Sequence, residues 1–459
     1  METITPACAA ESGLLAELFK ALNESRVRYT VMRNYYTLPH SAGGSDLDIL
    51  IQPADADLAR TATLKAIEEA GGVPIGCAET VGFFKIYALG RKPNSNPTEW
   101  WGLGLDFNVG LHFSGLRLME EKAVLPLRYH QGIPVLPDGV AGVLGVLKEV
   151  LHNGVFPARY AAAAREAAVD EWPRIESLLD PMGSPALTRL RAMLLSALPP
   201  DQLGGDCAQL RGEFLRHVAT RVGLVRTFGQ RIKYLQSKLW RYARPSGLVL
   251  AVLGVDGAGK STLIHSILPA LQDATHNAVT VRHLRPTVLP PLGRLKGRRY
   301  SNEGPVTEPH GATPSGTLGS LLRLAYLTLD YIVGYWLWTR PRIAKAPAVV
   351  IFDRYAYDMA LDPRRFRIAL PTPVTNWFAA IAPKPDLIIC LLGDSETITA
   401  RKGELSAAET RRQQTALRAF AEREPRAVLV STDTDIAQTR DSVLDAICTY
   451  LHRRSHGKG

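Results

Sequence analysis

The stretch LAVLGVDGAGKSTLI, residues 250–264, decides the fold of the second half of this 459-residue chain. An apolar run leads into a loop of small residues, and an apolar helix begins directly after it. The stretch matches the pattern G-x-x-x-x-G-K-[ST], with Gly254, Gly259, Lys260 and Ser261 at the fixed positions. That pattern is informative only between a strand and a helix, and both neighbours are present. A phosphate-binding loop is therefore favoured over a strand–turn–helix with chance glycines.

Each residue type in this loop has a chemical reason. Glycines, here Gly254, Gly257 and Gly259, let backbone N–H groups turn inward around phosphate oxygens, and the following helix presents its positive N-terminus. Lys260 reaches the β- and γ-phosphates of a nucleotide, and the Ser261 hydroxyl is a ligand for Mg²⁺. The sequence therefore predicts ATP and Mg²⁺ as cofactors.

Two later stretches add charge to this picture. In VVIFDRYAYD, Asp353 ends an apolar strand, where a carboxylate can hold a magnesium ion's water shell, and Arg354 follows to grip a phosphate. The stretch RKGELSAAETRRQQTALRAFAE is a candidate mobile lid whose cations converge on a moving phosphoryl group. Its basic residues are Arg401, Lys402, Arg411 and Arg412. A solvated charged helix is the alternative for any one of them.

The stretches GVDGAGKST, DRY, PDLIICLLGDSETITARKGE and VSTDTDIAQTRDSVLDAICTYL follow one another in a familiar order and spacing. Together they resemble the thymidylate kinase group of nucleoside monophosphate kinases, over Leu248 to about Arg453. The resemblance implies an ATP-dependent kinase, a phosphotransferase that moves the ATP γ-phosphoryl group to a nucleoside monophosphate.

The resemblance also implies roles for single residues. ATP and magnesium would be bound by Lys260, Ser261 and Thr262. Asp256, inside the loop, matches the acid that contacts the acceptor's sugar, and Asp353–Arg354 would lie at the acceptor phosphate. Arg401 would act from the lid. The residues expected to be catalytic are thus Lys260, Asp353, Arg354 and Arg401.

Departures from the family pattern leave the acceptor open. Thymidylate kinases carry T-R-E-P-G-G-T after the second strand, whereas HLRPT here keeps only Arg285 and Pro286. A partial echo, TEPHGAT at Thr307 to Thr313, comes too late, inside a Pro-rich insertion at 285–316 of unassigned role. DRYAYDMALDPRR resembles thymidylate-kinase-like proteins of surface polysaccharide synthesis. Two alternatives follow: a kinase of a sugar or glycan hydroxyl, and an ATP-binding regulatory module without turnover.

Acidic residues near the amino terminus indicate a second site. In GGSDLDILI, Asp46 and Asp48 lie two apart on a predicted strand and so share a face, and Asp106 on another strand can complete a two-metal Mg²⁺ site. This resembles the nucleotidyltransferase superfamily, although Arg33 and Asn34 stand where the family has Gly and Ser. The alternative to a metal site is a structural role, in which Asp46 caps a turn and Asp48 is exposed on an edge strand. Arg33, which replaces the family's glycine, could instead contact a triphosphate.

The pattern along the chain predicts three regions, two of α/β class and one helical. Strands alternate with helices in residues 13–159, predicted to form an α/β nucleotidyltransferase-like domain. Strand signals vanish in 160–244, a predicted helical connector. Residues 246–455 are predicted to form a thymidylate kinase-like P-loop NTPase domain, in which short apolar strands build a parallel sheet covered by helices on both faces.

Two stretches have features of membrane-associated segments, one of a surface-binding helix and the other of a membrane span. RTFGQRIKYLQSKLWRYAR carries six basic and no acidic residues, and we expect a solvated linker helix in preference to a phosphate- or membrane-facing one. Residues 316–340 are apolar enough to suggest a span, but Arg323 and Asp330 would each cost several kcal/mol in a bilayer. A helix buried between a sheet and other helices is expected there instead, and no transmembrane segment.

Composition bounds the remaining expectations. A net charge of +10 favours anionic partners, here a nucleotide and its phosphoryl acceptor; nucleic acid is not expected, since charge alone suggests it. Five scattered cysteines, none in a C-x-x-C pair, argue against a disulfide framework and a zinc site. The amino terminus lacks the pattern of a signal peptide, so a cytoplasmic protein is expected. A homodimer is one state that the sequence allows.

Overall fold

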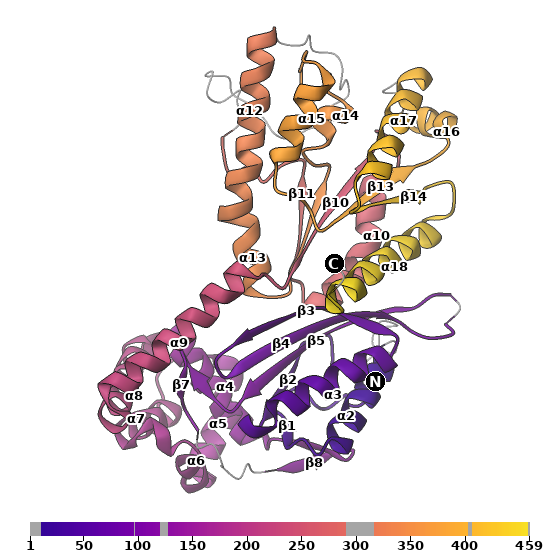
Figure 1. The fold of residues 1–459 in the computed structure, drawn as a ribbon. Coiled ribbons are helices and arrows are strands. Elements are labelled where there is room, and N and C mark those ends of the chain that lie inside the picture. The colour runs from indigo at the N-terminus through magenta and orange to yellow at the C-terminus, as the bar shows by residue number, and fades with distance from the viewer. Residues whose placement is uncertain (1–10, 96, 120–126, 291–315, 403–405, 458–459) are drawn as a thin grey trace. The chain divides into compact units, whose positions relative to one another are not determined.

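The computed structural model describes residues 11–95, 97–119, 127–290, 316–402 and 406–457 (Figure 1). The chain divides into two units, Met1–Ala243 and Arg244–Gly459, and each has its own sheet and hydrophobic core. The helical segment predicted for 160–244 lies almost wholly in the first unit, together with the mixed region that precedes it.

The first unit is built on a seven-stranded sheet in the order β3-β4-β5-β2-β1-β9-β8. Its strands are β1 (Tyr29–Val31), β2 (Leu47–Ile51), β3 (Gly72–Thr80), β4 (Phe83–Arg91), β5 (Trp100–Val109), β8 (Arg128–His130) and β9 (Ile133–Val135). Most neighbours are antiparallel, but β2 pairs with β5 and β1 pairs with β9 in parallel. The strands predicted from RYTVM, LDILI and GFFKIYAL are confirmed, whereas β3 carries no clear alternation and was not anticipated.

Two helices cover one face of this sheet. They are α2 (Ser12–Glu24) and α3 (Ala56–Glu69), and their apolar faces pack with Leu47, Ile49 and Ile51 of β2 in one core. After α3, Gly71 adopts a left-handed backbone conformation (φ 73°) that lets the chain turn directly into β3. Leu50 points to the opposite face because side chains alternate along a strand.

On that opposite face a set of helices forms the second core of the unit. These are α4 (Asp138–Asn153), α5 (Ala158–Asp170), α6 (Trp172–Leu178), α7 (Ser184–Leu195) and α8 (Gly204–Val222). A small hairpin of β6 (His112–Phe113) and β7 (Leu116–Arg117) contributes Phe113 and Leu116 to the same core. The chain then continues into α9 (Leu224–Ala243), which has no buried residue.

The second unit contains a five-stranded parallel sheet in the order β11-β12-β10-β13-β14. Its strands are β10 (Leu248–Gly254), β11 (Val279–His283), β12 (Val349–Asp353), β13 (Leu387–Leu392) and β14 (Ala427–Ser431). Every residue of β10 and β13 is buried, as expected for central strands of a parallel sheet covered on both faces.

Helices lie on both faces of this sheet. They are α10 (Lys260–Thr275), α12 (Thr317–Gly334), α13 (Arg340–Lys345), α14 (Asp358–Leu361), α15 (Thr372–Ile381), α16 (Ser395–Lys402), α17 (Ala407–Arg423) and α18 (Ile436–Ser455). α12, α15 and α17 share a core with alternate residues of β10, whereas α10 and α18 pack together and also contact sheet strands. The predicted parallel sheet between helices is thus confirmed.

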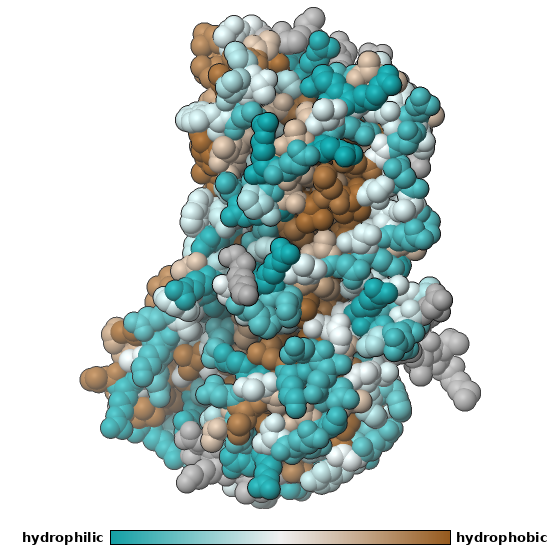
Figure 2. All heavy atoms as spheres, turned by 45° about the vertical axis from the view of Figure 1, so that its right-hand side comes forward, coloured by the Kyte–Doolittle hydropathy of each residue, from teal (hydrophilic) through white to brown (hydrophobic). Residues whose placement is uncertain are grey.

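Two expectations for this unit are corrected. β11, predicted as a buried strand, is the edge strand and is only partly covered, since nothing pairs with its outer side in the described chain. α12 is not wholly buried: Leu324 and Tyr331 lie in the core, but Leu318, Leu322 and Leu329 are exposed. Exposed apolar side chains appear as brown patches on the upper part of the molecule in Figure 2, which is the second unit.

The charged residues of this helix also have a place. Asp330 is fully buried and accepts hydrogen bonds from Arg285 Nη1 at 3.0 Å and from the backbone N–H groups of Thr287 and Leu289. Within the described ranges, no helix combines the length and the apolar character needed to cross a bilayer.

Candidate active site

The glycine loop joins β10 to α10 at the carboxyl edge of the parallel sheet. β10 ends at Gly254, and α10 begins at Lys260. Gly257 (φ 86°) and Gly259 (φ 83°) have left-handed backbone conformations, which other residues adopt only with strain. The glycines at these two positions let the chain curl back on itself and enter the helix, so the second unit has the strand–loop–helix arrangement of a P-loop fold.

Lys260 is held inside this loop. Its ammonium group is buried and donates hydrogen bonds to the carbonyl oxygens of Gly254 and Val255, both at 2.8 Å. The Asp256 carboxylate is 3.9 Å away. Burial and the positive charge of Arg354 together lower the pKa of Lys260 to about 8, against the opposing effect of Asp256. The loop therefore holds Lys260 at the start of a helix with neutral carbonyl oxygens as its hydrogen-bond partners.

Asp256 is the centre of a buried ion cluster. Both of its carboxylate oxygens accept hydrogen bonds from arginines, one from Arg354 and the other from Arg365. Burial raises the pKa of Asp256, but the charges of Arg354, Lys260 and Arg365 outweigh burial and hold that pKa below its ordinary value. The cluster thus contains three cations around one fixed carboxylate.

The position of Arg354 is set by its backbone. Arg354 follows the last residue of β12 and has a left-handed conformation (φ 75°), and its N–H donates to the carbonyl of Val252 at 3.0 Å. Its guanidinium also donates to Asp358 at 3.3 Å, and Asp358 accepts the backbone N–H of Tyr355 at 2.8 Å. A strained residue at a strand end is typical of functional sites. Here it turns a buried arginine toward the loop.

Asp353 and Ser261 offer oxygen atoms that a magnesium ion could bind. One oxygen of Asp353 lies 3.1 Å from His283 Nδ1, whereas the other, Oδ1, is buried and has no hydrogen-bond partner among the described residues. Ser261, in the first turn of α10, is exposed, as is Thr262. Mg²⁺ binds oxygen ligands and keeps several waters, so an unsatisfied carboxylate oxygen fits it. These residues fit the predicted metal.

The candidate lid is described only in part. Arg401 and Lys402 end α16, and their side chains lie outside the described part of the structure. Arg411 on α17 is exposed. Arg412 pairs with Glu409 one turn earlier and donates to the carbonyl of Leu361 at 3.3 Å. The predicted lid role of these residues stays a prediction.

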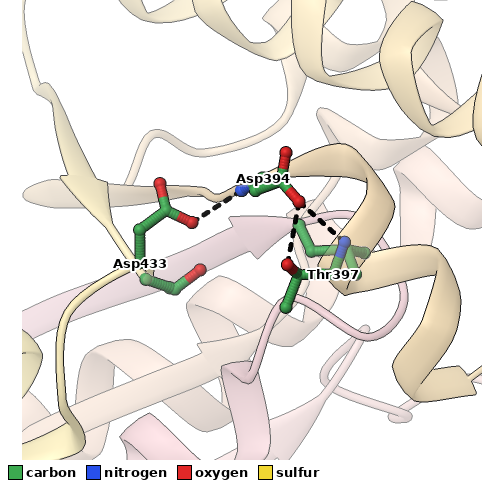
Figure 3. Close-up of a pocket in the computed structure, with 5 residues that line it drawn as sticks. Asp394, Thr397 and Asp433 are labelled. Carbon is green, nitrogen blue, oxygen red and sulfur yellow. Dashed lines mark hydrogen bonds between the residues drawn. The ribbon is translucent and has the colours of Figure 1, made fainter.

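A pocket opens at the same edge of the sheet, beyond β13 and β14. It has a volume of about 200 Å³ and is lined by Asp394, Thr397, Ile398, Thr432 and Asp433. Figure 3 shows the Asp394 carboxylate accepting the N–H and the hydroxyl of Thr397, and Asp433 accepting the N–H of Asp394. The carboxyl ends of parallel strands meet at one edge, where α/β folds place their ligands.

In the first unit, the three predicted carboxylates come together. Asp48 of β2 lies opposite Asp106 of β5 in the parallel pairing, and Asp46 precedes β2. Each faces a cation: Arg33 contacts Asp48 and lies 4.0 Å from Asp46, and Lys85 pairs with Asp106. Asp48 is buried rather than exposed.

The charges of this second cluster are tightly balanced. Lys148 of α4 is 3.7 Å from Asp48, and Arg33 also donates to Tyr160 of α5. Burial raises the pKa of Asp106 to about 7, against the lowering effect of Lys85. Within the described ranges, no group of three or more His, Cys, Asp or Glu side chains is arranged to hold a metal. In this arrangement side-chain cations neutralise the carboxylates. Oδ1 of Asp48 and Oδ1 of Asp106 nevertheless have no hydrogen-bond partner among the described residues.

Sequence reasoning missed three contributors to the cluster at the glycine loop. Arg365, Asp358 and His283 contact Asp256, Arg354 and Asp353 respectively. The tandem arginines of DPRR at 362–365, which follow α14, were a signal for Arg365. His283 could have been found as the last residue of a strand that ends beside Asp353.

Comparison with known proteins adds little to this description. No protein-family model matches the chain, and a search of curated proteins found no match. Among solved structures, the chain is similar to a thymidylate kinase from Ehrlichia chaffeensis, with 12% sequence identity and a TM-score of 0.31. The alignment covers 44% of this chain and 98% of that one.

Proposed function

We propose that the second unit is a Mg-ATP-dependent phosphotransferase that transfers the γ-phosphoryl group of ATP to a nucleoside monophosphate. One observation carries the proposal: Lys260 at the head of α10 lies beside a carboxylate clamped by Arg354 and Arg365. Lys260 at a helix N-terminus suits the phosphates of a nucleotide donor, and the pair of arginines suits an anionic acceptor.

The donor site follows from the loop. Backbone N–H groups at the start of α10, with the helix dipole, favour the phosphates of ATP. Lys260 would exchange the carbonyl oxygens of Gly254 and Val255 for β- and γ-phosphate oxygens. Ser261 and Asp353 would hold Mg²⁺, which supplies charge neutralisation to the phosphates when bound. Positioning and electrostatic stabilisation are most of what phosphoryl transfer requires of a protein.

The arginines favour a phosphorylated acceptor over a plain sugar or glycan hydroxyl. Arg354 is buried, and its Nε has no hydrogen-bond partner among the described residues. A neutral hydroxyl acceptor gives two guanidinium groups nothing to neutralise, whereas an acceptor phosphate accepts from both in a bidentate manner. Asp256 would then hold the two arginines in place and accept from the acceptor's sugar.

For the first unit, we propose a nucleotidyltransferase-like domain with Asp46, Asp48 and Asp106 at its centre. The in-register pairing of Asp48 with Asp106 supports this, since it brings carboxylates from two strands to one place. Metal use there would require Lys85 and Arg33 to give up these carboxylates. Calorimetric titration with Mn²⁺ tests it: the Asp106→Asn variant should bind one or two ions fewer than the wild-type protein.

The kinase proposal is tested with radiolabelled ATP and a panel of nucleoside monophosphates and sugars. Transfer should require a phosphorylated acceptor and should fall to background in Lys260→Ala. Arg365→Ala should lower kcat/KM for the acceptor about fiftyfold, the loss of roughly 2–3 kcal/mol expected for a charge-assisted contact. The neighbouring Arg364 is exposed, so Arg364→Ala is the matched control and should stay within twofold.

Three results would contradict the proposal. Transfer to an unphosphorylated sugar would move the assignment to the glycan alternative. Tight ATP binding without transfer to any acceptor would favour the regulatory module. Equal losses in Arg364→Ala and Arg365→Ala would mean that the contact with Asp256 does not matter to the reaction.

A further inference from the structure

Helix α9 exposes a continuous apolar stripe. Six apolar residues recur along its 20 residues at the spacing of one helix face: Leu224, Val225, Phe228, Ile232, Leu235 and Leu239. On a helix with 3.6 residues per turn they fall within an arc of about 100°. All six are exposed, from 39% for Ile232 to 86% for Val225. A surface helix of a soluble domain normally buries such a stripe.

The opposite, polar face of α9 is the one that packs on the first unit. Tyr234 and the backbone of Gln230 lie so close to Gly115 that a side chain at that glycine would collide with them. Arg241, on the same face, has a buried Nε, and burial lowers its pKa. α9 also contacts β3 and β7. The helix is therefore fixed to its own unit with its apolar stripe directed away.

The charge around the stripe is of one sign. Between Glu213 and Asp256 the sequence contains no acidic residue. The helix carries five basic residues: Arg226, Arg231, Lys233, Lys238 and Arg241. Arg231 and Lys238 fall at one edge of the apolar arc, where long basic side chains reach the level of lipid headgroups.

From these observations we infer that α9 binds the surface of an anionic lipid bilayer, lying in the interface with its stripe among the acyl chains. An amphipathic helix with a basic polar face is the form that such binding takes. Each basic residue near an anionic membrane adds about fivefold to the affinity, and the apolar stripe adds the rest.

Other occupants fit less well. A second copy would bring two basic helices face to face, and like charges repel. The chain's own second unit is also basic, since Lys and Arg outnumber Asp and Glu by 28 to 19 in residues 244–459. A nucleic acid would pair with the basic residues but leave the apolar stripe in water. A bilayer with anionic headgroups satisfies both features at once.

The test is co-sedimentation of the full chain with vesicles at 0.1 M salt. We expect binding to vesicles of phosphatidylcholine with 30% phosphatidylserine, weak binding to phosphatidylcholine alone, and release by 0.5 M salt. Leu235→Gln/Leu239→Gln should weaken binding about tenfold per leucine, since each buries an apolar side chain in the bilayer. Arg231→Gln/Lys238→Gln should weaken it about fivefold per residue.

The matched control is Leu58→Gln/Leu198→Gln. Leu58 and Leu198 are each 51% exposed in the same unit, close to the 58% and 63% of Leu235 and Leu239. This control should bind as the wild type does. No binding to anionic vesicles, or equal losses in both leucine pairs, would overturn the inference. A dimer in sedimentation velocity that Leu235→Gln/Leu239→Gln converts to monomer would also overturn it in favour of a second copy.

Discussion

Lys260 should take up a proton when the protein binds Mg-ATP at alkaline pH. In the structure, burial and the charge of Arg354 lower its pKa from 10.5 to about 8, although Asp256, Asp358 and Asp353 oppose that change. A difference of this size corresponds to roughly 3 kcal/mol in favour of the neutral amine. At pH 8.5 about three quarters of the molecules therefore carry a neutral Lys260.

Phosphate oxygens would reverse this preference. Placed against the β- and γ-phosphates, the lysine returns to its charged form, because anionic oxygens replace the neutral carbonyls of Gly254 and Val255 as its partners. The expected uptake is about 0.7 proton per nucleotide bound at pH 8.5 and nearly none at pH 6.5, where Lys260 is already charged.

Isothermal titration calorimetry measures this uptake. A non-hydrolysable ATP analogue is titrated at each pH in two buffers with large and small ionisation enthalpies, and the difference in heat gives the protons exchanged. Lys345→Arg, which changes an exposed lysine of the same unit, should keep the uptake. Lys260→Arg, whose guanidinium does not titrate, should lose it if it binds. Binding without proton uptake at pH 8.5 in the wild-type protein would refute the reasoning.

The same group sets a stability trend. Since the folded pKa lies below the unfolded one, the unfolded chain binds more protons between pH 8 and about 10.5. Lys260 therefore makes the nucleotide-free protein more stable as pH rises through that window, and bound nucleotide should remove this contribution.

Three further perturbations have expected magnitudes. Asp256→Asn removes the carboxylate that joins buried Arg354 to partly buried Arg365, although Arg354 keeps Asp358, and it should lower the free energy of unfolding by about 2 kcal/mol in chemical denaturation; adding Arg365→Gln should restore part of it, and a purely additive double variant would contradict the ion cluster. Asp330→Ala should cost about 3 kcal/mol because it leaves Arg285 unpaired, whereas exposed Asp57 changed to Ala should cost under 0.5 kcal/mol. Asp435 caps α18 by accepting the N–H of Gln438, so Asp435→Ala should lower stability by about 1 kcal/mol; no change in the thermal midpoint would contradict this.

Much of the candidate site could be predicted from the sequence because it is local. The glycine loop needs residues that curl the backbone within a few positions of a strand and a helix, and Gly257 and Gly259 take the left-handed conformations that this requires. Asp353 and Arg354 were expected at a strand end because an apolar run stops there, and β12 ends at Asp353. Short apolar runs likewise indicated a parallel sheet between helices, since period and composition are carried by neighbouring residues.

Surface and core were harder to separate by pattern. The apolar residues of α12 and α9 predict helices in both places, and both helices are present. Whether an apolar face is covered depends on what lies opposite it, which no window of neighbouring residues contains. The expected buried helix at 316–340 therefore exposes one face, and the connector helix packs by its polar side.

The ion partners were decided by tertiary structure. Arg365 meets Asp256 from 109 residues away, and Lys85 meets Asp106 only because β4 and β5 pair in a register that sets them opposite each other. Backbone conformation and amphipathic period are properties of short segments, so the sequence by itself determined the loop, the helices and those strands that are marked by apolar runs. Strand order and register depend on how all the apolar faces pack together, and only the folded chain decided which charges meet.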